Sequence, residues 1–392
     1  MSSDISENKK LNFISIINKG NSFFEVKKNE SKSLLLNKKY ILLKTGFTLI
    51  IFLQILFFLY YIRFGKILLT NIFLLKENQE SIFKNSNITY HFLVEGDMFS
   101  ENMKKKYEIQ QDLFCQNQIL FNNAILEAKI KTVKIDFENI YFNMLVYKEN
   151  DIVSNQISEK GFWEARETRN FLFSLSYYSQ KKNISKNHIY ILDIGANIGW
   201  FSLFFGKKGY KIISFEPSFS NYYILLKNFC MNKEINITII NSGLDNVTKN
   251  SSLYHPLYNI GNAYTYDAAK KLNLKNYIKE DIKFSKLSDY IPYLSNKNLA
   301  LIKLDIEGCE GKALEGGIDL IIKYHIPFIF MEWTPDLMKV KGSDPKLFLE
   351  MFENNGYKIS IKDFLSKQFS SMEQLLKEKE INIYIIYTKF LE

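Results

Sequence analysis

Acidic side chains near two predicted strand ends are the residues in this sequence best suited to moving a proton. Asp305 and Glu307 stand in IKLDIEGCEGKALEGG, and Glu332 stands near the end of PFIFMEW. A carboxylate within hydrogen-bond reach of a hydroxyl group can act as its general base. We therefore expect Asp305 to be a general base, and Glu307 and Glu332 to orient the molecule that loses the proton. A favourable charge at a helix start explains Glu310 and Glu315 equally well, but it does not explain Asp305.

A glycine turn precedes these acids in the chain. The stretch ILDIGANIGWFSLFF, residues 191–205, passes from a strand pattern through Gly195 and Gly199 into a helix pattern. The dinucleotide fingerprint G-x-G-x-x-G needs a glycine where Asn197 stands, because a pyrophosphate must touch bare backbone there. A turn without that glycine, with Asp193 before it, indicates a cationic ligand that carries no phosphate. The predicted cofactor is therefore S-adenosyl-L-methionine, and an NAD-binding dehydrogenase is disfavoured.

Two further strand ends complete the predicted cofactor pocket. Glu216 ends the strand KIISFEP and can accept both hydroxyl groups of a ribose through its two oxygens. A surface glutamate is the alternative, but the apolar strand before Glu216 and Pro217 after it favour the ribose. Ser242, at the end of the next strand, stands where such a sheet places an adenine. Oxygen-ligand chemistry leaves open a divalent cation bridged by Asp305 and Glu307, although no metal site is predicted.

The order of strand and helix patterns indicates the fold that positions these residues. Strands alternate with helices, which predicts an α/β domain with a mostly parallel sheet. Ligands of such sheets bind outside the carboxyl ends of the strands. Strands are also expected within 134–147, and a helix from Gly161. The strands of the sheet are expected at 188–195, 211–217, 235–243, 299–308, 327–333, 357–361 and 381–388, the last two as an antiparallel pair.

The first 130 residues are predicted to lie outside the catalytic domain. Residues 1–39 are polar and rich in lysine, and we expect a disordered cytosolic tail. Residues 45–62 carry no charge and reach about 27 Å as a helix, which spans a bilayer. A transmembrane helix is therefore expected over 40–63, since a buried helix of a soluble protein would show a polar face. A helical stem is expected over 64–130, and the catalytic domain over 131–392.

The lysines that flank this span predict its orientation. Six lysines stand within residues 27–44, whereas three cationic residues follow the span within residues 63–76. The positive-inside rule then places the N-terminus in the cytosol. We expect a single-pass type II membrane protein of the endoplasmic reticulum or Golgi, with a lumenal catalytic domain. After the predicted span, five asparagines begin N-x-S/T sequons, namely Asn87, Asn183, Asn236, Asn246 and Asn250.

Composition indicates a globular body and argues against nucleic acid as a partner. The chain has 392 residues, 46% of them hydrophobic, and a formal net charge of +9. Its lysines are scattered along the chain, whereas a nucleic-acid-binding protein gathers its basic residues on one face. Cys115, Cys230 and Cys309 are too few and too widely spaced for a disulfide framework or a zinc site. We expect three free thiols, although one bridge remains possible.

From about residue 150 to residue 390 the chain resembles the FkbM-type methyltransferases, a branch of the S-adenosylmethionine-dependent Rossmann-like enzymes. The resemblance rests on NDIVSNQISEKGFWEARETRNFL, ILDIGANIGWFSLFF, FEPS, LIKLDIEGCEGKALEGG and FIFMEWTPD, in the family's order. It implies a class I methyltransferase fold with a seven-stranded, mostly parallel sheet and a terminal antiparallel hairpin. It also implies methylation of an oxygen atom, often on sugars or other small metabolites. By resemblance, the cofactor residues are Asp193, Gly195, Asn197, Gly199 and Glu216, with Trp163 and Glu164 on a helix that flanks the pocket.

The resulting hypothesis is a membrane-anchored methyltransferase that O-methylates a glycan, a glycoconjugate or another small hydroxyl-bearing acceptor. The competing hypothesis is a non-catalytic, membrane-anchored binding protein that retains the fold. The presence of Asp193, Glu216, Asp305 and Glu307 speaks against the binding protein, because binding alone does not need such a set of acids.

Overall fold

The computed structural model describes residues 101–117 and 123–392, and the side chains within these ranges from residue 107 onward. The cytosolic tail predicted over 1–39, the transmembrane helix predicted over 40–63 and most of the predicted stem lie outside these ranges. Within the described ranges, the helices are all too short or too polar to cross a bilayer.

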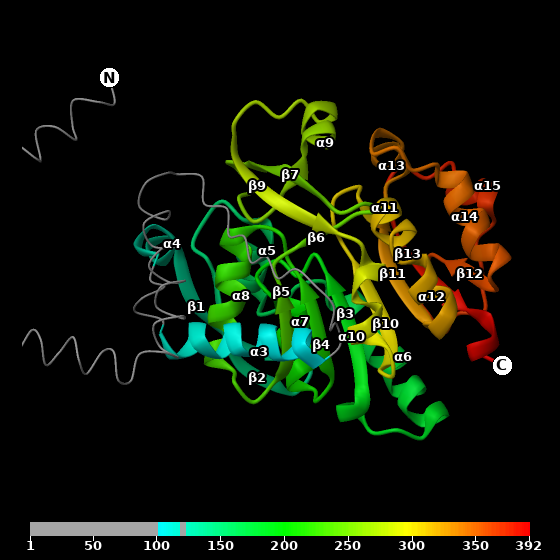
Figure 1. The fold of residues 1–392 in the computed structure, drawn as a ribbon, viewed down its shortest axis with the longest axis horizontal. Coiled ribbons are helices and arrows are strands. Elements are labelled where there is room, and N and C mark those ends of the chain that lie inside the picture. The colour runs from blue at the N-terminus through cyan, green and yellow to red at the C-terminus, as the bar shows by residue number, and fades with distance from the viewer. Residues whose placement is uncertain (1–100, 118–122) are drawn as a thin grey trace, which may run out of the picture. The chain divides into compact units, whose positions relative to one another are not determined.

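A seven-stranded sheet forms the centre of the domain predicted over 131–392 (Figure 1). Its strand order is β12-β13-β11-β10-β3-β4-β5. Neighbours from β5 to β11 pair in parallel, and β13 is antiparallel to both β11 and β12. The strands are β3 (Ile189–Ile194), β4 (Lys211–Phe215), β5 (Asn236–Ile240), β10 (Asn298–Leu304), β11 (Phe328–Trp333), β12 (Tyr357–Ser360) and β13 (Ile381–Tyr387). The predicted α/β sheet and its antiparallel end are therefore confirmed.

Helices cover both faces of this sheet and enclose two apolar cores. On one face lie α6 (Ala165–Lys182), α7 (Trp200–Lys207) and α8 (Phe219–Met231), and on the other lie α10 (Ile291–Leu294), α12 (Ile318–Tyr324) and α14 (Pro345–Asn354). Strand β3 supplies both cores, since Ile191 packs on the first face and Leu192 on the second. Burial of both faces explains the nearly continuous apolar sequence of these strands. Shorter helices are α5 (Ile152–Lys160), α11 (Glu310–Glu315), α13 (Pro335–Val340), α15 (Met372–Leu375), η1 (Lys186–His188), η2 (Leu287–Tyr290) and η3 (Thr388–Phe390).

An antiparallel hairpin precedes the sheet. It consists of β1 (Ile130–Phe137) and β2 (Ile140–Tyr147), as the alternating sequence predicts. Strand β2 packs against α8, where the Asn228 side chain accepts from the Leu145 N–H at 2.6 Å and donates to the Leu145 carbonyl at 3.0 Å. The hairpin is thus fixed on the outer side of the first helical layer by backbone hydrogen bonds as well as by apolar packing.

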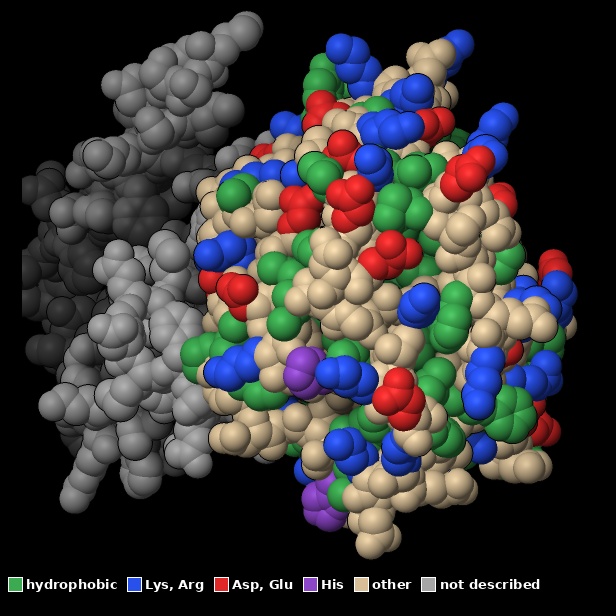
Figure 2. All heavy atoms as spheres, turned by 90° about the vertical axis from the view of Figure 1, so that its right-hand side faces the viewer, with side chains coloured by type: hydrophobic (Ala, Val, Ile, Leu, Met, Phe, Trp, Pro, Cys, Tyr) green, Lys and Arg blue, Asp and Glu red, His purple; other side chains and the backbone are tan. Residues whose placement is uncertain are grey.

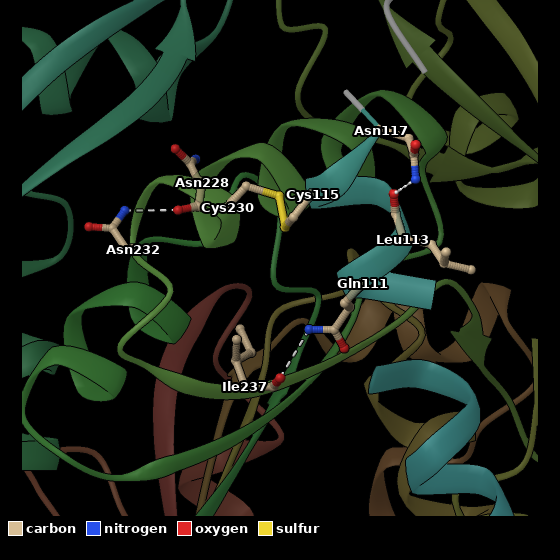
Figure 3. The surroundings of a disulfide bond; sticks show 8 residues. All are labelled: Gln111, Leu113, Cys115, Asn117, Asn228, Cys230, Asn232 and Ile237. Atoms are coloured by element: carbon tan, nitrogen blue, oxygen red, sulfur yellow. Dashed lines mark hydrogen bonds between the residues drawn. A yellow bond between two sulfur atoms is a disulfide. The ribbon is translucent and has the colours of Figure 1, made fainter. Parts of the chain in front are cut away.

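Helix α3 (Glu101–Gln116) and the short α4 (Ala124–Lys129) belong to the catalytic domain rather than to a separate stem. The Gln111 amide donates to the carbonyl of Ile237 and accepts from the N–H of Ile239, both at 3.0 Å, so it pairs with the free edge of β5 (Figure 3). Phe114 and Leu126 are buried in the first core. The expected domain boundary at residue 130 is therefore wrong for these segments, because helical apolar spacing fits a core-packed helix as well as a stem.

A disulfide bond joins α3 to α8. Cys115 and Cys230 are bridged, with their Cα atoms 5.3 Å apart (Figure 3). Cys309 is a free, buried thiol. The expectation of three free thiols is therefore wrong, because the fold brings together two cysteines that are 115 residues apart in sequence.

A second sheet lies between β5 and β10 in the chain and beyond the end of the central sheet (Figure 1). It has four strands in the order β6-β9-β7-β8 and is accompanied by α9 (Tyr266–Lys271). The strands are β6 (Gly243–Leu244), β7 (Lys249–Pro256), β8 (Tyr264–Thr265) and β9 (Tyr277–Ser285). We call residues 243–285 the insert. Its loop between β7 and β8 extends over the carboxyl ends of the central strands, where it lines the cavity described next.

Charge is mixed over the surface rather than gathered into a stripe on the face seen in Figure 2. Lysine and arginine side chains alternate with acidic ones across that face. The excess of nine positive charges thus does not form a basic patch there, as the scattered lysines of the sequence predict.

Candidate active site

A cavity of about 480 Å³ lies at the carboxyl ends of β3, β4, β10 and β11. The chain proceeds from β3 to β4 on one side and returns to β10 on the other, so the cavity lies at the topological switch point of the sheet. Of the described residues that line it, none is Lys, Arg or His. Seven carry carboxyl groups, namely Asp151, Glu164, Glu216, Asp305, Glu307, Glu332 and Glu380.

The predicted glycine turn forms one wall of this cavity. Gly195 has φ +77°, and a Cβ atom there would lie 2.0 Å from the backbone oxygen of Asp305, so no side chain fits. Asn197 also has a positive φ of 51° and lines the cavity. Gly199 precedes α7 with φ +99° but does not line the cavity, because its Cα faces Leu225. Gly199 therefore serves the packing of α7 on α8, and direct contact with a ligand is not supported for it.

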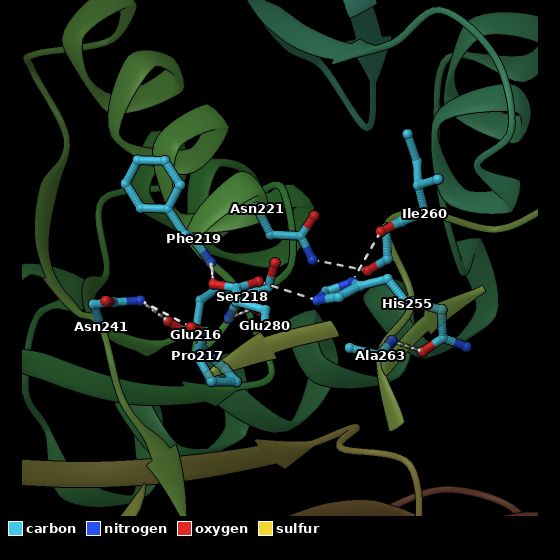
Figure 4. Close-up of polar contacts among 12 residues, drawn as sticks. Glu216, Pro217, Ser218, Phe219, Asn221, Asn241, His255, Ile260, Ala263 and Glu280 are labelled. Carbon is cyan, nitrogen blue, oxygen red and sulfur yellow. Dashed lines mark hydrogen bonds and ion pairs between the residues drawn. The ribbon is translucent and has the colours of Figure 1, made fainter. Parts of the chain in front are cut away.

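Glu216 lies just after β4 and faces the turn. Its two carboxylate oxygens accept from the backbone N–H groups of Asn197 and Ser218, each at 2.8 Å. Figure 4 shows Glu216 beside Ser218. Burial raises the pKa of Glu216 to about 7, although both hydrogen bonds favour the charged form. Each oxygen keeps a second lone pair for a ligand hydroxyl. The position thus matches the predicted ribose acceptor.

Ser242 also lines the cavity, on the insert side of the Glu216 wall. Its hydroxyl is hydrogen-bonded to Ser285 at 2.8 Å and to the carbonyl of Gly243 at 2.9 Å. The side chain is therefore committed to the junction between β5 and the insert. Ser242 therefore lines this end of the cavity, but its hydroxyl group is hydrogen-bonded to other protein atoms.

Asp193 does not line the cavity. Its Oδ2 atom accepts from the Ser202 hydroxyl at 2.5 Å, and its Oδ1 atom lies 3.7 Å from the Lys303 ammonium. The side chain is 1% exposed. Asp193 is expected to meet the ligand directly or through water, and a direct contact is not supported, because strand alternation points this residue at α7, beneath the turn. Lys303 links Asp193 to the turn, since its ammonium also donates to the Gly195 carbonyl.

Asp305, Glu307 and Glu332 line the opposite wall together. Burial raises the pKa of Glu307 to about 8 and that of Glu332 to about 9, and the neighbouring charge of Asp305 adds to both shifts. Side-chain hydrogen bonds from Asn262 and Tyr264 of the insert act against the shift of Glu307. Asp305 is more accessible, with 36% of its side chain exposed. The three predicted acids thus share one cavity with the glycine turn.

Trp163 and Glu164 line the cavity at the residues that precede α6, not within the helix. Glu164 occupies the N-cap position with a left-handed backbone at φ 41° and ψ 56°, and its side chain does not cap the helix. Burial and the charge of Asp305 raise the pKa of Glu164 to about 8. Its Oε2 atom is buried without a hydrogen-bond partner in the described part of the chain.

Sequence reasoning missed several residues of this site. Lys303 lies in the parallel strand beside Asp193, and Asp151 precedes α5 with its Oδ1 atom buried and unpaired among the described residues. Tyr264 and Asn262 reach the cavity from the insert, which was not predicted. The sequence could have indicated Lys303, because a residue two places before Asp305 on the same strand lies on the same face of the sheet.

A histidine–glutamate pair fixes the insert beside Glu216. The Nε2 atom of His255 lies 3.1 Å from Glu280, and Nδ1 lies 3.2 Å from the carbonyl of Ile260 (Figure 4). The second oxygen of Glu280 accepts from the Phe219 N–H at the start of α8 at 2.6 Å. These bonds hold the loop between β7 and β8 over the cavity.

Comparisons with known proteins give one family match and several similar solved structures. Residues 193–359 match the family model described as the methyltransferase FkbM domain. No curated protein matches the chain. Among solved structures, the chain is similar to the bifunctional kinase-methyltransferase WbdD, with 11% identity and a TM-score of 0.35 over 59% of this chain and 41% of that chain. The chain thus spans about two fifths of the length of WbdD.

Two further solved structures are similar over most of their own length. The plantazolicin methyltransferase BpumL in complex with SAH has 13% identity and a TM-score of 0.30 over 59% of this chain and 87% of that one. The precorrin-6y C5,15-methyltransferase from Geobacter metallireducens has 16% identity and a TM-score of 0.29 over 58% and 90%.

The family match falls on the parallel sheet and on the glycine turn at its switch point, so this part of the chain is similar to a methyltransferase domain. The predicted resemblance is confirmed over residues 193–359, which match the FkbM methyltransferase domain, and S-adenosyl-L-methionine is the cofactor that this match supports.

Proposed function

We propose that this protein is a membrane-anchored O-methyltransferase whose acceptor is a glycan or glycoconjugate. The observation that carries the proposal is the pairing, in one cavity, of the glycine turn with a wall of three acids, Asp305, Glu307 and Glu332. S-adenosyl-L-methionine supplies a methyl group on a sulfonium sulfur, and transfer needs an acceptor atom held in line. A hydroxyl acceptor also needs a base for its proton, and the acid wall supplies one.

Each cavity residue has a role in this proposal. Glu216 accepts the ribose hydroxyls while the backbone N–H groups of Asn197 and Ser218 hold its carboxylate in place. Ser242 shapes the adenine end, and Glu164 faces the positive end of the cofactor. Asp305 takes the acceptor proton. Glu307 and Glu332, whose raised pKa values keep them protonated near neutral pH, donate hydrogen bonds to neighbouring acceptor oxygens.

The charge of the cavity supports an uncharged, hydroxyl-bearing acceptor. Seven carboxyl groups line the cavity, and no cationic side chain of the described residues does. A phosphate or carboxylate on the acceptor would therefore enter without a counter-charge, which is costly in a partly buried site. Carboxyl, amide and hydroxyl groups along the walls instead match the donors and acceptors of a saccharide.

We also propose a lumenal location for the catalytic domain. The anchor is the apolar segment predicted over 40–63. The Cys115–Cys230 bridge supports an oxidising compartment, where such bonds persist. Three of the sequon asparagines, Asn183, Asn236 and Asn250, are exposed on the described domain and thus accessible to glycosylation. Mass spectrometry of the protein from its own cells tests this: glycans at Asn183 and Asn236 are expected, and complete absence of both, with free thiols at Cys115 and Cys230, would contradict it.

The decisive experiment follows a labelled methyl group. The purified full-length protein in detergent is titrated calorimetrically with S-adenosyl-L-methionine, and is then incubated with isotope-labelled cofactor and an oligosaccharide fraction from the same cells. We expect binding, followed by label on a sugar oxygen in the released oligosaccharides. Binding without transfer to any fraction favours the competing non-catalytic binding protein. Label on nitrogen or carbon would contradict O-methylation.

A further inference from the structure

Lys303 is a buried cation placed between the cofactor turn and the acid wall. It lies on β10 directly beside Asp193 of β3 in the parallel register. Its ammonium group donates to the carbonyl oxygen of Gly195 at 3.0 Å, and lies 3.7 Å from Asp193 Oδ1 and 3.6 Å from Asp305 Oδ2. The Lys303 side chain is 5% exposed. One ammonium thus contacts the predicted general base, the glycine turn and the buried acid beneath it.

The surroundings keep this ammonium charged. Burial lowers the pKa of Lys303, but the charges of Asp305 and Asp193 outweigh burial, so the net shift is upward. A buried charge without partners would be very costly, and these two carboxylates supply the partners. Lys303 is therefore a fixed positive charge at the edge of a cavity whose lining carries none among the described residues.

Lys303 distinguishes Asp305 from the other acids of the wall. Among the described residues, no ion pair within 4.0 Å involves Glu164, Glu307 or Glu332, whereas Asp305 has Lys303 at 3.6 Å. The charged groups that face Asp305 are Lys303 on β10, Asp193 on β3, Glu164 before α6, Glu307 and Glu310 after β10, and Glu332 on β11. Only one of these groups is positive, and it lies beside Asp305.

We propose that Lys303 is a positioning residue that, through its ion pair with Asp305, selects Asp305 as the general base among the acids of the cavity wall. The inference rests on the proposed O-methyl transfer, but concerns which acid performs it and why. The same ammonium also donates to the Gly195 carbonyl. The choice of the base and the position of the cofactor turn therefore depend on one side chain.

Proton release on cofactor binding tests the proposal without an acceptor. The full-length protein is titrated with S-adenosyl-L-methionine at about pH 6 in two buffers of different ionisation enthalpy, which yields the number of protons released per binding event. If the Lys303 ammonium selects Asp305 as the charged acid, Asp305 contributes no proton in wild type. Without that ammonium, in Lys303→Met, the proposal predicts that Asp305 releases a proton to the buffer when the cationic ligand binds. We expect about half a proton or more of additional release, a direct consequence of linkage.

Three further variants complete the experiment. Lys303→Arg retains the charge and is expected to match wild type. In Lys303→Met combined with Asp305→Asn, the additional release should vanish, because the titrating group is gone. Lys303→Met leaves the buried Asp193 carboxylate without its partner. The double variant Asp193→Asn/Lys303→Met removes that carboxylate, so the test can still be made if Lys303→Met does not fold. It is expected to show the additional release.

The outcomes separate the two proposals. Equal proton release in wild type and in the folded Lys303→Met or Asp193→Asn/Lys303→Met protein overturns the role of Lys303. Additional release that persists after Asp305→Asn assigns it to another acid and also overturns it. Once an acceptor is identified, the acid limb of the pH–turnover profile should move upward in Lys303→Met but not in Lys303→Arg. Failure of methyl transfer by wild type, with the proton result intact, contradicts the proposed reaction alone.

Discussion

Glu216 combines a structural task with a binding task in one carboxylate. It closes the turn by accepting from Asn197 and Ser218, and its free lone pairs face the cavity. We predict that Glu216→Ala weakens S-adenosyl-L-methionine binding by about 10- to 100-fold, the scale of lost hydrogen bonds to a charged group. It should also lower the melting temperature, since two backbone N–H groups lose their acceptor.

Glu280→Ala is the matched control for this prediction. Glu280 also accepts from a backbone N–H, that of Phe219, but it does not line the cavity. Its removal should lower the melting temperature with a smaller effect on affinity. Calorimetry and thermal unfolding of both variants separate the two tasks, and equal affinities for the two variants would remove the ribose role of Glu216.

Asp305 is predicted to act in the chemical step rather than in binding. Asp305→Asn preserves the shape of the side chain but cannot take a proton, so turnover should fall about 100-fold or more, the usual contribution of a general base. The dissociation constant of the cofactor should change little. Label transfer at saturating cofactor measures the first quantity and calorimetry the second, and undiminished turnover would exclude Asp305 as the base.

For single residues, the sequence predicts which side chains gather at the strand ends, but not which of them line the cavity and which are buried beneath it. Gly195, Asn197, Glu216, Asp305, Glu307 and Glu332 all line one cavity, because each stands at or just beyond the carboxyl end of a parallel strand. Asp193 stands within β3, one residue before its end at Ile194, and is covered by α7. The strand pattern places Lys303 on the same face as Asp305, but its contact with Asp193 could not be predicted until the strands were placed side by side.

Among the elements, apolar strands are predictable and the insert is not. The seven central strands are buried on both faces and are recognised by their apolar runs. Strand β9 exposes most of its first residues, including Tyr277 and Ile278, and its sequence YIKEDIKFS shows no continuous apolar run. The insert is held by specific polar contacts, such as that of His255 with Glu280, whose partners lie far apart in sequence.

The disulfide between α3 and α8 is expected to stabilise the domain without touching its ligand. Its cysteines are separated by 115 residues, for which loop closure contributes up to about 4 to 5 kcal/mol in the chain-entropy model. Neither cysteine lines the cavity. Replacing both Cys115 and Cys230 with alanine should lower the melting temperature by several degrees and leave cofactor affinity unchanged.

Reduction supplies the control for the disulfide prediction. A reducing agent should shift the melting temperature of wild type toward that of the double variant, and should leave the double variant itself unchanged. A double variant as stable as oxidised wild type would show that hydrogen bonds such as those of Gln111 with β5 are sufficient to hold α3 in place.

For the whole molecule, the acid cavity predicts a pH dependence of stability. Burial raises the pKa of Glu216 and Glu310 to about 7, of Glu164 and Glu307 to about 8, and of Glu332 to about 9. The folded state then binds more protons than the unfolded state above the ordinary glutamate pKa. Stability must fall as pH rises through this range, because unfolding becomes easier wherever the unfolded state binds fewer protons.

The measurement is a series of thermal unfolding curves between about pH 5 and pH 8. The melting temperature of the cofactor-free protein should decrease across the series, and less steeply in Glu332→Gln. Glu373→Gln is the control, since Glu373 is exposed and remote from the cavity. Cationic S-adenosyl-L-methionine should stabilise most at the alkaline end. A melting temperature that rises with pH would contradict the burial of these acids.

If the proposed anchor holds the protein from its N-terminal side, the attachment of α3 has a mechanical consequence. A pull that enters the domain at Glu101 follows α3 and loads the hydrogen bonds of Gln111 with the edge of β5 first. Peeling of the helix then stops at Cys115, where the covalent bridge transmits the force to α8. The load is thereby transferred to a packed helix before it reaches the rest of β5.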